Sequence, residues 1–114
     1  MGNEQVTIWI EAEHWIPGEW NPADANSDVI VTRLDGGRWI ASFFSYINIK
    51  TLTEKYKRTG ENLSGAYFWS SDMILVDEVS RQRIEEVVHE LINRGDFERI
   101  FRCVQPEEEK DAHE

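Results

Sequence analysis

The stretch Asp28-Val-Ile-Val-Thr-Arg-Leu-Asp-Gly-Gly-Arg-Trp-Ile-Ala-Ser-Phe-Phe-Ser-Tyr46 decides the fold class of this 114-residue chain. Two runs rich in β-branched and aromatic residues, 28–34 and 38–46, flank Asp35-Gly36-Gly37. Glycine supplies the positive φ that a tight hairpin turn demands, and β-branched and aromatic residues favour strands. The stretch therefore predicts an antiparallel β-hairpin, to which the other elements are added.

The segment before the hairpin predicts another strand. Apolar side chains alternate with other side chains from Val6 to Trp15, and this period of two is typical of a half-buried strand. One face would carry Val6, Ile8, Ile10 and Ala12, and the other Thr7, Trp9, Glu11, Glu13 and Trp15. Residues 16–27 contain two prolines and several turn-forming residues, so they predict a long surface loop.

Two helices are expected after the hairpin. Asn48 can cap a helix that begins at Ile49 and ends at Gly60. A second helix would follow Ser80 and end at Gly95. Its apolar side chains recur at helical spacing and form one stripe: Ile84, Val87, Val88, Leu91 and Ile92. The pattern of residues 96–104 predicts one or two further helical turns or a short edge strand.

Between the two helices, residues 66–77 predict a fourth strand. Its Met73–Val76 core is apolar on both faces, which favours a central position in the sheet. The element order is therefore β-β-β-α-β-α, and we expect an α+β fold built as a two-layer sandwich. Residues 1–104 would form a single domain, and residues 105–114, with three successive glutamates, a disordered acidic tail.

The charge of the chain restricts its partners. The chain has 22 acidic and 12 basic residues and a formal net charge of −10, and residues 1–28 contain no Lys or Arg. Nucleic acid and anionic membrane surfaces are disfavoured as partners because phosphate contacts need clustered basic residues. A basic protein would be attracted to the acidic N-terminal third. Plain solubility is the alternative reason for this charge.

The sequence contains no recognisable targeting segment or cofactor-binding motif. It contains no run of about 18–20 apolar residues, which a membrane helix would need. The N-terminus lacks the basic and apolar regions of a secretory signal, and Cys103 is the one cysteine. We therefore expect a cytoplasmic protein. No phosphate-binding glycine loop or zinc signature is found, so no cofactor is predicted.

The aromatic residues suggest a binding surface near the N-terminus. If the predicted strand is uncovered on one side, its indoles stand beside carboxylates, together with a third indole in the following loop. Such a patch would select a cationic partner, partly through cation–π contacts. The candidate binding residues are Trp9, Glu11, Glu13, Trp15 and Trp20. The alternative is that these indoles cover the second face of the sheet as part of the core.

Other residues could carry chemistry, although each has a simpler structural explanation. Asp72 falls in the strand expected to be most buried, where a carboxylate needs a partner. It could instead mark a bulge or the true start of that strand. Glu11 and Glu13, with His14 nearby, could hold a cation. In the last helix, Glu85 and His89 have a chelating i, i+4 spacing. Solvation of a strand or helix face is the favoured explanation of these polar pairs.

The chain from Asp28 to Phe101 resembles a group of small acidic bacterial proteins of unknown function. The resemblance lies in residues 28–31, 39–46, 67–74 and 83–88. It implies a bacterial origin and one compact domain, and it carries no established activity from which functional residues could be transferred.

Three hypotheses about function follow. The first is a non-enzymatic protein that binds a basic protein, as a toxin-neutralising or regulatory partner. The second is a small hydrolase or metal-dependent enzyme that uses Asp72 or Glu11, Glu13 and His14. The third is a homodimer that uses an unmatched sheet edge or the Trp-bearing face.

Overall fold

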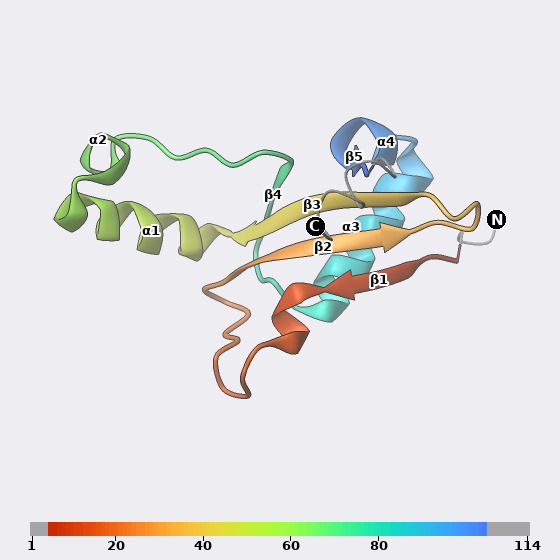
Figure 1. The fold of residues 1–114 in the computed structure, drawn as a ribbon, viewed down its shortest axis with the longest axis horizontal. Helices are drawn as coiled ribbons and strands as arrows, with labels where there is room; N and C mark the ends of the chain where they lie inside the picture. The colour runs from red at the N-terminus through yellow and green to blue at the C-terminus, as the bar shows by residue number, and fades with distance from the viewer. Residues whose placement is uncertain (1–4, 105–114) are drawn as a thin grey trace, which may run out of the picture.

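The computed structural model describes residues 5–104. Its first half contains β1 (Thr7–Ile10), the 3-10 helix η1 (Glu11–His14), β2 (Asn26–Thr32), β3 (Arg38–Ser45) and α1 (Tyr46–Thr59). Its second half contains α2 (Glu61–Gly65), β4 (Met73–Val76), α3 (Arg81–Arg94), α4 (Phe97–Ile100) and β5 (Arg102–Cys103). The predicted α+β class and the order β-β-β-α-β-α are confirmed, and α2, α4 and β5 are short additions (Figure 1).

The five strands form one open sheet in which β3 has the most neighbours. β1, β2 and β3 pair antiparallel in sequence order. On the far side of β3, β4 pairs parallel with the C-terminal half and β5 pairs antiparallel with residues 39–40. β4 therefore ends the main strand order, and the predicted central position is wrong. Leu75, which is 43% exposed, lies on the sheet face opposite the buried Val76 and across from Phe44.

The predicted hairpin is the β2–β3 pair. Gly36 adopts φ +88° in the turn, and its N–H donates to the carbonyl of Arg33 at 2.9 Å. The Gly37 N–H donates to the Asp35 carboxylate at 2.8 Å. The Asp-Gly-Gly sequence thus closes the turn as expected, and Asp28 lies opposite Ser42.

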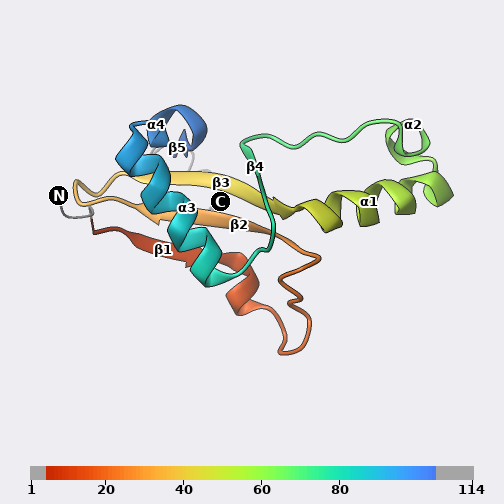
Figure 2. The ribbon, with the colours of Figure 1, turned by 180° about the vertical axis from the view of Figure 1, so that it is seen from behind.

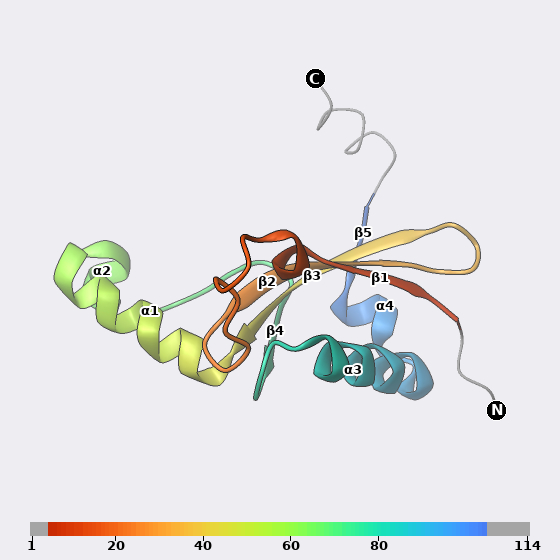
Figure 3. The same cartoon turned by 90° about the horizontal axis from the view of Figure 1, so that it is seen from below.

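The core lies between one face of the sheet and the layer formed by α3 and α4. Figure 2 shows α3 running obliquely across the strands, and Figure 3 shows that α4 lies on the same side. α3 begins after Ser80, whose hydroxyl accepts the Arg83 N–H, and ends at Gly95 as predicted. The fully or nearly fully buried apolar side chains include Ile10, Val29, Val31, Ala41, Phe43, Ile84, Val88, Phe97 and Phe101. This arrangement accounts for the predicted stripe on the last long helix.

α1 does not join this helical layer. It continues from β3 and projects beyond the end of the sheet, together with α2 (Figures 1 and 3). The helix begins three residues earlier than predicted, because Ser45 caps it and accepts the Asn48 N–H at 3.1 Å. It ends at Gly60, which is left-handed at φ 88°.

Two predicted strands are shorter than expected. The run from Val6 to Trp15 is a strand only as far as Ile10, because η1 follows. In the run 66–77, only Met73–Val76 pairs with a neighbour. Residues 97–103 contain both a helical turn and a short strand, which the sequence left open. The predicted acidic tail, 105–114, lies outside the described residues.

Candidate functional site

The candidate residues near the N-terminus do not share one strand face. The strand ends because Ala12 turns into the core, where it is buried and its N–H donates to the Ser27 hydroxyl at 3.0 Å. The backbone then follows a 3-10 turn, so side chains no longer alternate between two faces. The prediction that Trp9, Glu11, Glu13 and Trp15 form one row is therefore wrong.

Trp9 and Glu11 lie at the sheet face opposite α3. The Trp9 indole is 41% exposed, stacks on the His14 ring at 5.1 Å between ring centroids, and lies across from Ile30. The Glu11 carboxylate accepts the N–H of Asp28 at 3.3 Å. Asp28 and Ile30 point to the same side of β2 because they are two residues apart. This face therefore presents the Trp9 indole close to the carboxylates of Glu11 and Asp28.

Glu13 is held on the other side of η1 by Arg81 of α3. The Arg81 Nε and Nη2 atoms donate to the two carboxylate oxygens at 2.6 and 2.9 Å. Arg81 also donates to Glu85 at 2.8 Å and to the backbone carbonyl of Ile8 at 2.8 Å. The hydrogen bond from Arg81 holds the pKa of Glu13 below its ordinary value of 4.5. We call this four-residue arrangement the Arg81 clamp.

Trp15 and Trp20 are partly buried and line a hollow beside the clamp. The Trp20 indole N–H donates to the carbonyl of Val79 at 2.8 Å, and both indoles pack against the core. The hollow has a volume of about 430 Å³, and its wall includes Ile16, which is 69% exposed. Its lining residues are Ala12, Glu13, Trp15, Ile16, Pro17, Gly18 and Trp20. These two indoles therefore contact the core and also border an open hollow.

The acidic character of this region is retained in three dimensions. Residues 11–28 contain five acidic side chains and no Lys or Arg. Arg81 compensates Glu13, and Asp24 is hydrogen-bonded to α1. Glu19 is exposed in the loop and Asp28 is exposed on β2. We define the acidic surface as Trp9 with Glu11 and Asp28 on one side of η1, and Glu19 with the Trp15–Trp20 hollow on the other.

Asp72 is accounted for by its position at the start of β4. It is left-handed at φ 53°, and its carbonyl accepts the N–H of Ser42 at 2.9 Å. Its carboxylate is paired with Arg102 at 3.1 Å and is not deeply buried. The strand begins at Met73, directly after Asp72, so the interpretation of Asp72 as a marker of the strand start is confirmed. Among residues 5–104, the expected hydrogen bonds from nearby backbone N–H groups to its carboxylate are replaced by the Arg102 contact.

The histidine and metal candidates are spread over separate elements. His14 lies in η1 against Trp9, whereas His89 lies on α3. Glu85 accepts from Arg81, and the Nδ1 atom of His89 is buried without a hydrogen-bond partner within residues 5–104. In that same range, no three His, Cys, Asp or Glu side chains converge in a way that could hold a metal ion.

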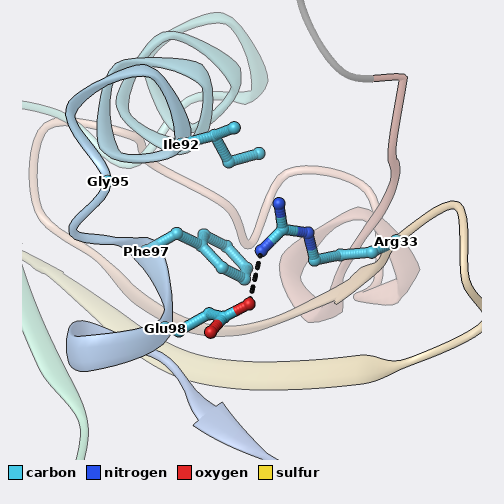
Figure 4. A pocket seen from close by; sticks show the side chains of 5 residues that line it. All are labelled: Arg33, Ile92, Gly95, Phe97 and Glu98. Atoms are coloured by element: carbon cyan, nitrogen blue, oxygen red, sulfur yellow. Dashed lines mark hydrogen bonds and ion pairs between the residues drawn. The ribbon is translucent and has the colours of Figure 1, made fainter.

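A second hollow lies between the hairpin turn and the α3–α4 connection (Figure 4). It measures about 260 Å³ and is lined by Arg33, Ile92, Gly95, Phe97 and Glu98. The Arg33 guanidinium lies 4.9 Å above the Phe97 ring and pairs with Glu98 at 3.4 Å. These contacts explain Arg33 as a residue that packs the hairpin onto α4.

Sequence reasoning missed the most apolar exposed region, which is the projection formed by residues 46–71. Leu63 is 76% exposed and Trp69 is 69% exposed, and Tyr46, Ile47 and Tyr67 are also exposed. Two features of the α1 sequence indicate an exposed helix. Ile47 falls outside the stripe of Ile49, Leu52 and Tyr56, and the helix is rich in basic residues. None of the helices within the described range is long and apolar enough to cross a membrane.

Comparisons with protein-family models, with curated proteins and with solved structures found no match to this chain.

Proposed function

We propose that this chain acts by binding a basic protein through its acidic surface. The observation that carries the proposal is the exposed Trp9 indole beside the Glu11 and Asp28 carboxylates, in a segment without Lys or Arg. An exposed indole with carboxylates nearby suits Lys and Arg side chains, which gain both ion-pair and cation–π contacts.

The hollow supplies the apolar part of the same surface. Ile16 and the edges of Trp15 and Trp20 offer an apolar wall on which a partner side chain can be buried. Hot spots of protein interfaces are enriched in Trp, and the surrounding acids would set which partner is accepted. Neutralisation or regulation of a basic protein is a role that such a surface fits.

The test is capture of partners by three forms of the purified chain. Glu11→Lys/Glu19→Lys reverses two charges of the acidic surface, and Glu86→Lys/Glu90→Lys reverses two exposed charges on α3 as a matched control. We expect a basic protein that is retained by the wild type and the control and lost by the first variant. Its retention should fall when NaCl is raised from about 50 to about 500 mM, because salt screens exposed charges.

The captured protein is then purified and titrated against each form. Partners that bind all three forms equally, or whose binding is indifferent to salt, would overturn the proposal. Equal melting temperatures of the three forms confirm that lost binding is not lost folding.

A further inference from the structure

The segment formed by residues 46–71 projects from the sheet (Figure 1) and carries several exposed apolar side chains. We call this segment the arm. α1 alone has 14 residues and extends about 21 Å at 1.5 Å per residue. The exposed apolar side chains are distributed from its base to its tip: Tyr46, Ile47, Leu63, Tyr67 and Trp69. Exposed apolar clusters of this kind mark surfaces that contact another protein.

The arm is attached firmly at its base. Asp24, in the loop after η1, accepts hydrogen bonds from Asn48 and Thr51 of α1, both at 2.8 Å. Phe68, on the segment that returns to the sheet, contacts Tyr56 of α1 and Phe44 of β3, with centroid distances of 6.5 and 5.2 Å. These contacts fix the direction of the arm relative to the sheet, so its exposed side chains have defined positions.

The tip of the arm is equally constrained. Gly65 lies so close to α1 that a Cβ atom on it would be 2.4 Å from the Thr53 carbonyl oxygen. Asn62, Leu63 and Ser64 are all left-handed, a conformation that costs non-glycine residues about 1–2 kcal/mol each. This turn presents Leu63 to solvent at the end of the molecule.

The charge of the arm is opposite to that of the rest of the chain. It contains four basic residues, Lys50, Lys55, Lys57 and Arg58, and two acidic residues, Glu54 and Glu61. The whole chain nevertheless has a formal net charge of −10. The arm is thus basic and carries exposed aromatic side chains, which are the properties expected of a ligand of the acidic surface.

We propose that this chain forms a two-fold symmetric dimer in which the arm of each protomer lies on the acidic surface of the other. The inference rests on the proposed function, because it assigns the same acidic surface a basic ligand from a second copy. The arm and the loop after η1 meet at Asp24 and then diverge at a wide angle (Figure 1). A two-fold axis near this corner would bring each arm to the loop of the other protomer.

In this dimer, both arms and both acidic surfaces are covered, so the assembly is closed. Contact between two arms would instead place basic residues against basic residues, which is unfavourable. A closed two-fold dimer also leaves no free arm, so it predicts a dimer rather than a growing fibre. A foreign basic partner would then have to displace the second copy from the acidic surface.

Sedimentation equilibrium of the purified chain tests the proposal. We expect a species of twice the 13.4 kDa chain mass, with a dissociation constant that rises about tenfold or more in high salt. Lys55→Glu/Lys57→Glu in the arm and Glu11→Lys/Glu19→Lys on the acidic surface should each give monomers. Arg94→Glu/Arg99→Glu, at the opposite end of the molecule, is the control for the arm variant and should remain dimeric.

Mixing the two monomeric variants gives the sharpest result. In the mixed pair, the acidic arm meets the basic surface and the wild-type arm meets the wild-type surface, so both contacts are complementary. We expect the mixture to form a heterodimer at concentrations where neither variant dimerises. A wild type that is monomeric up to about 1 mM, arm variants that still dimerise, or a mixture that stays monomeric would each overturn the dimer.

These results separate the dimer from the proposed function. A monomeric wild type that still captures a basic protein through Glu11 and Glu19 refutes the dimer alone. A dimer rescued by charge exchange, with no foreign basic protein captured, refutes the proposed function alone. If both hold, the arm variant should capture the foreign partner more readily, because its acidic surface is free.

Discussion

Removing the Arg81 side chain should loosen the junction between the N-terminal segment and α3. Arg81 donates to both oxygens of Glu13, to Glu85 and to the backbone carbonyl of Ile8, so one guanidinium joins β1, η1 and α3. Truncation in Arg81→Ala leaves the Ile8 carbonyl and the Glu13 carboxylate without these donors. We therefore expect a loss of stability that exceeds that of an ordinary surface ion pair.

The magnitude follows from the geometry and the exposure. Hydrogen bonds to charged groups contribute about 1.5–3 kcal/mol each when shielded, whereas exposed ion pairs contribute about 0.2–1 kcal/mol. The side chains of Arg81 and Glu13 are 39% and 32% exposed, so solvent screens much of the attraction. We expect Arg81→Ala to lower the free energy of unfolding by about 1.5 kcal/mol. At about 4 °C per kcal/mol this lowers Tm by about 6 °C.

The loss should depend on pH in a defined direction. The Arg81 hydrogen bond keeps the pKa of Glu13 below 4.5 in the folded state. The unfolded chain therefore takes up a proton at a higher pH than the folded chain does, and acid favours unfolding. This contribution is complete above about pH 4.5 and disappears as the pH falls through the lowered pKa of Glu13. The stability difference between wild type and Arg81→Ala should narrow in the same range.

Urea unfolding followed by tryptophan fluorescence at pH 7 and at intervals down to pH 3 measures both effects. Arg83→Ala is the matched control, because Arg83 lies on the same helix and its ion pairs among residues 5–104 are with the exposed carboxylates of Asp77 and Glu86. The control should lose less stability than Arg81→Ala. Equal losses for the two variants, or a loss in Arg81→Ala that does not change with pH, would refute the role given to the clamp.

Three further substitutions test the core, the base of the arm and its tip. Ile84→Ala removes a fully buried side chain from the α3–sheet interface and should cost about 2–5 kcal/mol in urea unfolding. Ser45→Ala removes the hydroxyl that accepts the N–H groups of Asn48 and Ala25, and should cost about 1–2 kcal/mol in the same assay. Gly65→Ala would place a methyl group 2.4 Å from the Thr53 carbonyl oxygen in a left-handed residue. Amide hydrogen exchange should then accelerate in α1 and α2 while α3 stays protected.

The sequence was most informative where local chemistry and burial agree. Asp35-Gly36-Gly37 specified the hairpin because its glycine freedom and its flanking β-rich runs point to the same structure. The stripe that includes Ile84 and Val88 specified α3 for a similar reason, since the Ser80 cap and Gly95 end fit the same helix. These elements together fix the fold class and one of its two layers.

The candidate site was predicted less well because tertiary contacts override alternation. Ala12 fits the alternating pattern of residues 6–15, yet its N–H is taken by the Ser27 hydroxyl and the chain turns at Glu11. Nothing in that pattern identifies Ser27 as the partner. Likewise, Arg81 lies 68 residues from Glu13 along the chain, so no short-range signal could reveal that this acid is compensated.

The position of the arm beyond the sheet could not be predicted from the sequence for another reason. β3 and β4 are parallel neighbours, and a helix that connects such strands usually packs across the sheet. Here the helix follows β3 directly from the Ser45 cap, and Asp24 holds its first turns in line with the strand. Its stripe of Ile49, Leu52 and Tyr56 is therefore only half-buried, and Tyr46 and Ile47 are exposed to solvent.

The Arg81 clamp also bears on how this protein can associate. An edge strand offers unpaired backbone groups to a strand from another chain, and β1 is such an edge. Arg81 occupies the Ile8 carbonyl on this edge, and η1 turns the chain away only four residues after β1 begins. Strand addition at β1 is therefore disfavoured, whereas Trp9, Glu11 and Glu19 remain accessible beside it. Association at this end of the molecule must then depend on side-chain contacts, and for an acidic surface those contacts select partners by charge.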